Sequence, residues 1–342
     1  MKFRLLLMLA GALALGPLGA ARARKVVVKM ATLAPKGSVF HRVLTEMAND
    51  WKEASGGRVE LRLFAGGVAG DDVDVVRKAR LGTLDGGLLT SAGVSTIDKA
   101  IHCLQVPMAY ASLREVDYVL DKMRPVLEKR YDDAGFIILS WVDAGWVRFF
   151  SKKPIVTPED LAAEKLFVWA GQDEVLDIWK GAGFNPVPLP STEISTALQT
   201  GLVTAVPTTP QATLLMQWNK NAPYMTDAPW APLMGATVIT KKTWEEIDPE
   251  LRPKLMEIAR KAGEKLRAEA RPADQRSIDA MAERGLTIVK VDEATRARWR
   301  ERLDGAMSKV RGVWVPADLF DEAMRHRDAF RKLGAFTDGA DE

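Results

Sequence analysis

Apolar and polar residues alternate in blocks of strand and helix length along the first hundred residues. Alternation or valine enrichment predicts strands over residues 25–31, 59–63 and 84–89. Apolar residues at helical spacing predict helices over residues 40–51 and 73–81. This strand–helix–strand order is typical of an open parallel sheet flanked by helices.

The predicted sheet indicates that two loops form the rim of a binding site. In open α/β sheets, ligands bind beyond the carboxyl ends of the strands. Loops 32–38 and 90–93 follow two of the predicted strands, so Thr32 and Ser91 become candidate ligand-binding residues. Asp71 or Asp72 is expected to cap the helix between those strands.

The middle of the chain predicts a second sheet. Residues 136–142 form a strong buried strand, and residues 143–148 are expected to cross from a first lobe into a second. Short strands follow near 166–169 and 186–189, and residues 233–240 are expected to cross back.

A long helix is predicted between Asp248 and Arg284, with Gly285 as its stop. At 1.5 Å per residue it would extend roughly 50 Å, enough to span two lobes. Pro253 and Pro272 argue for a kink or a break, because an internal proline removes a helix hydrogen bond.

The chain is longer than one hydrophobic core usually supports, which favours two lobes. The crossings assign residues 24–146 with 235–262 to lobe I, and residues 147–234 with 263–342 to lobe II.

Residues 1–23 have the pattern of a cleaved signal peptide. Lys2 and Arg4 precede an apolar run over residues 5–18, which is too short to span a bilayer, and small residues lead to a cleavage point after Ala23. The alternative is an uncleaved membrane anchor. A signal peptide predicts export to the periplasm.

Cleavage would remove three of the 48 basic residues and no acids, so 45 bases would face 45 acids. The mature chain then has no net charge and no clustered basic face, which argues against a nucleic-acid partner. Cys103 is the only cysteine, so no intrachain disulfide can form.

No pattern predicts catalysis or a cofactor. His41, His102 and His326 lie on separate elements without metal-ligand spacing, and no nucleophile or phosphate-loop motif occurs. Cys103 lies in an apolar run, which favours a core thiol over a nucleophile. We therefore expect no enzyme, no metal and no cofactor. An enzyme on a binding scaffold is the alternative, and turnover of a bound compound would reveal it.

A family resemblance covers about residues 25–312 and is densest over residues 145–203. Arg148 follows a Gly-Trp-Val segment, a Pro-Ile-x-x-Pro-Glu-Asp-Leu turn spans residues 154–161, and an Ala-Pro-Lys-Gly-Ser loop spans residues 34–38. The chain resembles the DctP-type extracytoplasmic solute-binding proteins that serve TRAP transporters. The resemblance implies an α/β two-lobe periplasmic binding protein fold with a long helix spanning both lobes. It also implies capture of a small molecule by hinge closure and delivery to a membrane permease.

The resemblance leaves the partner open in two respects. Some relatives also work with a helical-repeat partner protein. A periplasmic sensor, which presents its ligand to a receptor instead of a permease, is a further alternative.

The chain departs from the family pattern at two ligand-contacting positions. Phe167 stands where the family usually has an arginine that holds the ligand carboxylate. Residues 204–210 replace an acidic and amide motif by Thr-Ala-Val-Pro-Thr-Thr-Pro, so Thr208 and Thr209 become candidate contacts. An apolar ring has no donor for a carboxylate.

These departures predict an apolar or amphipathic solute, such as a fatty acid, a sterol or an aromatic acid. Phe167 and Trp169 share one face of a strand and are expected to point into the cleft, or else to pack on the helices of the second lobe. Trp146 and Trp230 belong to a group of tryptophans in and beside the second lobe. Arg148 is expected to meet an acidic headgroup, or else to form a structural ion pair with a carboxylate such as Asp143. The alternative solute is a dicarboxylate or other organic acid held by Arg148 alone.

Overall fold

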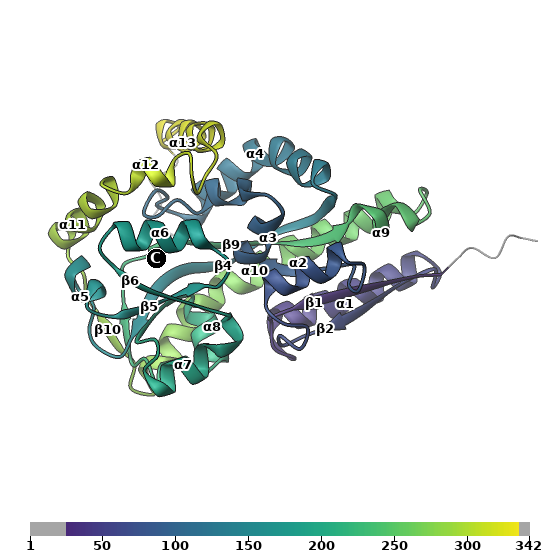
Figure 1. The fold of residues 1–342 in the computed structure, drawn as a ribbon. Helices are drawn as coiled ribbons and strands as arrows, with labels where there is room; N and C mark the ends of the chain where they lie inside the picture. The colour runs from purple at the N-terminus through teal and green to yellow at the C-terminus, as the bar shows by residue number, and fades with distance from the viewer. Residues whose placement is uncertain (1–24, 335–342) are drawn as a thin grey trace, which may run out of the picture.

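The computed structural model describes residues 25–334, so the predicted signal peptide lies outside the described residues. Two lobes share one continuous sheet, with helices on both of its faces (Figure 1). The main strand order is β2-β1-β3-β9-β4-β7-β5-β6.

Lobe I begins with the predicted alternation of strands and helices. The strands are β1 (Val26–Thr32), β2 (Val59–Phe64) and β3 (Gly86–Thr90), and the helices are α1 (Val39–Ala54), α2 (Asp72–Arg80), α3 (Ser91–Ile97), η1 (Lys99–Leu104) and α4 (Leu113–Asp133). β1 pairs with β2 and with β3 in parallel, as predicted. The sheet as a whole is mixed, because β9 runs antiparallel to β3.

Two long antiparallel strands connect the lobes. β4 (Phe136–Ser151) and β9 (Ala231–Thr240) pair along most of their length. Their register shifts between Asp143 and Trp146, where Gly145 has φ +87°. Such a bulge bends a strand and increases its twist, so the connection between the lobes turns at this point.

Lobe II is built on shorter strands. They are β5 (Lys165–Trp169), β6 (Asn185–Leu189), β7 (Ala205–Thr208), β8 (Tyr224–Thr226) and β10 (Thr287–Val289). Its helices are α5 (Pro158–Ala162), α6 (Asp173–Gly181), η2 (Ser191–Glu193), α7 (Ile194–Thr200), α8 (Pro210–Leu215), η3 (Trp218–Lys220) and α11 (Glu293–Asp304). The sequence prediction missed β7 and α8, because Pro207 interrupts the pattern of β7 and α8 is only six residues long.

The predicted long helix is α10 (Arg252–Ala282), which follows α9 (Lys241–Glu246). It packs against α1 and β4 in lobe I and against α8 in lobe II. Pro253 lies in its first turn, where its missing N–H has no helical acceptor. Pro272 lies inside the helix without ending it.

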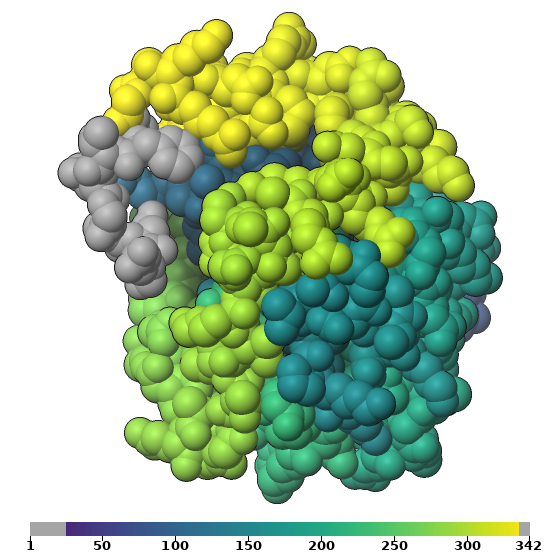
Figure 2. Space-filling model, turned by 90° about the vertical axis from the view of Figure 1, so that its left-hand side faces the viewer, coloured from purple at the N-terminus to yellow at the C-terminus, as the bar shows by residue number. Residues whose placement is uncertain are grey.

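The C-terminal segment corrects the predicted lobe boundary. α11 covers lobe II, and α12 (Met307–Val310) leads to α13 (Ala317–Lys332), which packs on α4 of lobe I. Figure 2 shows this yellow segment lying over blue residues of lobe I. Leu319 and Ala323 enter the lobe I core, so residues 263–342 do not all belong to lobe II. Within residues 25–334, no helix is long and apolar enough to cross a membrane.

Candidate functional site

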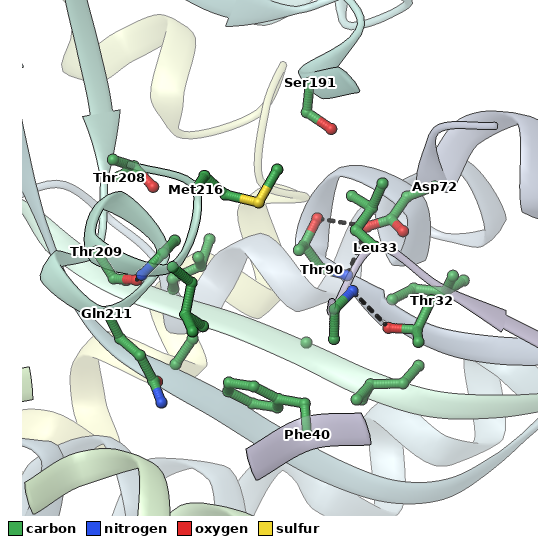
Figure 3. Close-up of a pocket in the computed structure, with 18 of the residues that line it drawn as sticks. Thr32, Leu33, Phe40, Asp72, Thr90, Ser191, Thr208, Thr209, Gln211 and Met216 are labelled. Atoms are coloured by element: carbon green, nitrogen blue, oxygen red, sulfur yellow. Dashed lines mark hydrogen bonds between the residues drawn. The ribbon is translucent and has the colours of Figure 1, made fainter. Parts of the chain in front are cut away.

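A cavity of about 190 Å³ lies between the lobes, at the carboxyl ends of the lobe I strands (Figure 3). Both lobes and both connecting strands contribute to its wall. The residues that define it are Thr32, Leu33, Phe40, Asp72, Leu89 and Thr90 from lobe I, Val142, Asp143, Leu233 and Met234 from the connecting strands, and Trp169, Ser191, Thr208, Thr209, Gln211, Leu215, Met216 and Trp218 from lobe II.

The lobe I wall is held by a buried carboxylate. Asp72 Oδ2 accepts hydrogen bonds from the Thr90 backbone N–H and hydroxyl, both at 2.7 Å, while Oδ1 has no partner. Burial raises the pKa of Asp72 to about 7, although the bonds from Thr90 oppose the shift. Thr32 lies beside them at the end of β1, and its hydroxyl accepts from the Ala34 N–H at 3.2 Å.

The lobe II wall combines hydroxyl groups with rings. Thr208 ends β7, and Thr209 caps α8, whose first residue is Pro210. Figure 3 shows Thr208, Thr209 and Gln211 across the cavity from Thr32, Asp72 and Thr90. Trp169 and Trp218 line the cavity from lobe II, and Phe40 lines it from α1 in lobe I.

The described lining residues include two carboxylates and no Lys, Arg or His. Arg271 on α10 neutralises Asp143, with an Nη2–Oδ2 distance of 2.7 Å, and also binds Asp117. Burial opposes the charge of Arg271, but the hydrogen bonds to Asp117 and Asp143 outweigh burial and raise its pKa.

Arg148 lies behind the cavity wall. It is opposite Thr208 in the β4–β7 register but is not part of the lining. Its Nη1 donates to the Asp227 carbonyl, and its Nε has no partner. Burial lowers the pKa of Arg148, and the charges of Asp274 and Asp227 oppose that shift. Asp143, the partner suggested by the sequence, binds Arg271 instead.

Phe167 does not reach the cavity. Its side chain is 0% exposed and packs in the lobe II core with Phe150 and Ile194. Its ring meets Trp169 edge to face at 5.0 Å between centroids. The predicted shared face is present, but only Trp169, at the carboxyl end of β5, lines the cavity.

Three other predicted residues lie elsewhere. Ser91 is buried in the first turn of α3, which replaces the expected loop because Thr90 caps this helix. Trp146 packs against the lobe I core. Trp230 stacks on Trp179 in an aromatic core cluster, with 5.5 Å between ring centroids.

That cluster explains the tryptophan enrichment of lobe II. Its rings come from β4, α6, the turn before β6, the segment before β9, and α11. Its members are Phe149, Trp179, Phe184, Trp230 and Trp299. Edge-to-face and stacked pairs contribute about 0.5–1.5 kcal/mol each beyond their burial. Most of the aromatic excess therefore stabilises the lobe and does not surround a ligand.

Sequence reasoning missed several lining residues. Phe40 fits the apolar face of a helix, Trp218 is one of many tryptophans, and the position of Asp72 favours a helix cap over a ligand contact. Asp71 provides that cap, which leaves Asp72 to face the cavity. Gln211 had no sequence signal of its own. Within the described residues, no group of three His, Cys, Asp or Glu side chains is arranged to hold a metal.

Two lobes, two connecting strands and an interlobe cavity define a solute-binding protein, and comparison with known proteins agrees. The family model "Bacterial extracellular solute-binding protein, family 7" (DctP) matches residues 30–311. The chain belongs to this family of TRAP transporter solute-binding proteins. Its members are extracytoplasmic substrate-binding receptors that work with membrane permease subunits.

Three relatives show the extent of the similarity. The 2,3-diketo-L-gulonate-binding periplasmic protein YiaO of Escherichia coli is 25% identical over 248 residues, which is 70% of this chain and 73% of that protein. A TRAP solute-binding protein of Pseudomonas putida with bound D-glucuronate superposes with TM-score 0.80 at 23% identity, covering 89% of this chain and 97% of that one. A sugar acid binding protein of Advenella mimigardefordensis in complex with galactonate gives TM-score 0.83 at 17% identity, covering 90% and 99%.

The expectation of a hydrophobic ligand is corrected by these findings. The two solved relatives named above hold sugar acids, and Phe167, on which the expectation depended, lies in the core.

Proposed function

We propose that this protein is the periplasmic receptor of a TRAP-type transporter and captures a compact organic acid of sugar-acid size. Residues 1–23 would direct its export. Closure of the lobes around the solute would produce the form that delivers it to the permease. The observation that carries this proposal is the cavity, whose wall combines Thr32 of lobe I with Trp169 and Thr208 of lobe II.

Size limits the solute. A cavity of about 150 Å³ holds one benzene ring. The cavity between the lobes is about 190 Å³, which suits a solute of roughly one ring and not a sterol or a long acyl chain. A sugar ring offers an apolar face to Trp169 or Trp218 and hydroxyl groups to the threonines, so it can use both kinds of wall.

Arg148 is the proposed counter-charge for the acid. It lies directly across the β4–β7 pairing from Thr208, and its Nε lacks a partner. Losing one partner of a buried charge pair costs about 2–5 kcal/mol of affinity.

A second candidate is an uncharged solute of the same size. The described lining residues favour it, because they include no Lys, Arg or His. In this case Arg148 is structural and its exchange leaves affinity unchanged. A receptor that signals instead of transporting would be distinguished by the absence of a permease gene beside its own.

Calorimetric titration of the mature protein with D-glucuronate, D-galactonate and D-glucose tests the proposal. Binding of an acid that is weakened at least thirtyfold by Arg148→Ala supports the organic-acid receptor. Binding of D-glucose as tightly as either acid would favour the uncharged solute. If none of the three binds, mass spectrometry of the compound released from denatured protein identifies the solute class.

A further inference from the structure

A carboxylate of lobe I binds lobe II beside the cavity. Asp71 Oδ2 accepts from the Ser191 backbone N–H at 2.5 Å, and Asp71 Oδ1 accepts from the Ser191 hydroxyl at 3.1 Å. Asp71 is only 6% exposed. Ser191 and Asp72, the neighbour of Asp71 in the chain, both line the cavity (Figure 3), so this contact lies beside its wall.

Asp71 is held in place before lobe II arrives. It caps α2 by accepting from the Asp72 N–H at 2.7 Å, and the Asp74 side chain accepts from the Asp71 N–H to complete a capping box. A carboxylate that is already ordered loses little conformational freedom when it gains another partner. Its hydrogen bonds are also charge-assisted, and such bonds are roughly twice as strong as neutral ones.

The other polar contacts between the lobes on this side of the cavity are weaker than the Asp71–Ser191 hydrogen bonds. Lys99 and Glu174 form an ion pair at 2.5 Å, but both side chains are 43% exposed, where ion pairs contribute little. Gln172 Nε2 reaches Ser95 Oγ only at 3.4 Å. A Cβ at Gly67 would lie 3.2 Å from Thr192 Cγ2, so the glycine lets the two lobes approach closely.

We propose that Asp71 and Ser191 form an interlobe latch that populates the closed conformation before any solute binds. The contact uses only protein groups, so it favours closure whatever the solute is. The apparent Kd of a solute equals its intrinsic Kd divided by the fraction of molecules in the binding-competent state. A larger fraction in that state therefore raises the apparent affinity. Asp71 therefore affects solute binding indirectly, because it positions lobe II against lobe I.

Asp71→Ser separates the latch from the helix cap. Serine caps helices about as well as aspartate, so the variant should keep the N-cap of α2. Its side chain is shorter and uncharged, so the variant should lose the hydrogen bonds to Ser191. Spin labels at Lys52→Cys and Leu202→Cys, both exposed and on different lobes, report lobe separation by pulsed electron resonance. Cys103 is fully buried, and burial raises the pKa of its thiol, so it does not compete for the label.

Ligand-free protein gives the decisive comparison. We expect a closed population in the parent protein and a closed-to-open ratio about tenfold lower in Asp71→Ser, as for the loss of one charge-assisted bond. Ser191→Ala keeps the backbone donor and should give a smaller decrease. Equal closed fractions in the parent and Asp71→Ser, including none in either, would overturn the proposal.

Two controls identify simple structural damage. Asp292→Ser removes a comparable carboxylate cap, from α11, and should leave the distance distribution unchanged. Asp71→Ser should unfold within a few degrees of the parent protein. A large loss of thermal stability, with Ser191→Ala indistinguishable from the parent, would assign Asp71 to α2 alone and contradict the latch. No solute is used, so failure of the proposed solute class does not affect this result.

Discussion

At the scale of single residues, the position of a residue along its strand decides whether its side chain lies in the core or lines the cavity. Phe167 and Trp169 have the same orientation on β5, and their rings touch. Trp169 is the last residue of the strand and lines the cavity, whereas Phe167 lies two residues earlier and is fully buried. Alternation in the sequence predicts the shared face, but it contains no information about depth.

Phe167→Ala is expected to lower the free energy of unfolding by about 3–5 kcal/mol, because it leaves a cavity in the lobe II core. Guanidinium unfolding followed by circular dichroism measures this loss. Exchange of a ring that merely contacted solute would change affinity and leave stability nearly intact. A loss below about 1 kcal/mol would therefore contradict the placement of Phe167 in the core.

At the scale of elements, the close packing of α10 on β4 depends on one glycine. An ideal Cβ at Gly263 would lie 2.5 Å from Ser140 Cβ and 3.2 Å from the Trp141 carbonyl. The long helix can therefore lie directly on the connecting strand only because this position lacks a side chain. The sequence predicted the helix from its length and composition, but the contact with β4 joins residues far apart in the chain.

Gly263→Ala is expected to destabilise the protein by about 1–3 kcal/mol, because overpacking exceeds the gain of roughly 1 kcal/mol in helix propensity. The exposed neighbour provides a matched control, since Glu264→Ala should change the free energy of unfolding by less than about 0.5 kcal/mol. Chemical denaturation of both variants makes the comparison. Stabilisation by Gly263→Ala would show that β4 moves away at little cost.

At the scale of the whole molecule, the fold buries the carboxylate of Asp72 beside the cavity. Burial raises the pKa of Asp72 to about 7, from an ordinary value of 3.8. Between these values the folded protein keeps a proton that the unfolded chain has released. Asp72 therefore makes the free energy of unfolding fall as pH rises through this window, by up to about 1.4 kcal/mol per pH unit.

Asp72→Asn should remove this contribution. Asparagine does not titrate, so the variant lacks the fall in the free energy of unfolding that Asp72 causes. The difference between the variant's free energy of unfolding and that of the parent protein should therefore increase as pH rises from about 4.5 to about 7.5. Guanidinium unfolding at several pH values measures both proteins. For Asp304→Asn, at an exposed position, the curve of unfolding free energy against pH should run parallel to that of the parent protein. Parallel curves for Asp72→Asn would contradict the pKa shift.

The alternating strands and helices that open lobe I, the two-lobe architecture, the long helix and the family could all be predicted from the sequence alone. These depend on periodicity and local motifs, which are readable along the chain. Three placements could not be predicted without the folded structure: Arg148 binds the Asp227 carbonyl, Trp230 belongs to a core cluster, and α13 returns to lobe I. Each depends on which distant element covers a side chain, and local patterns do not encode that choice.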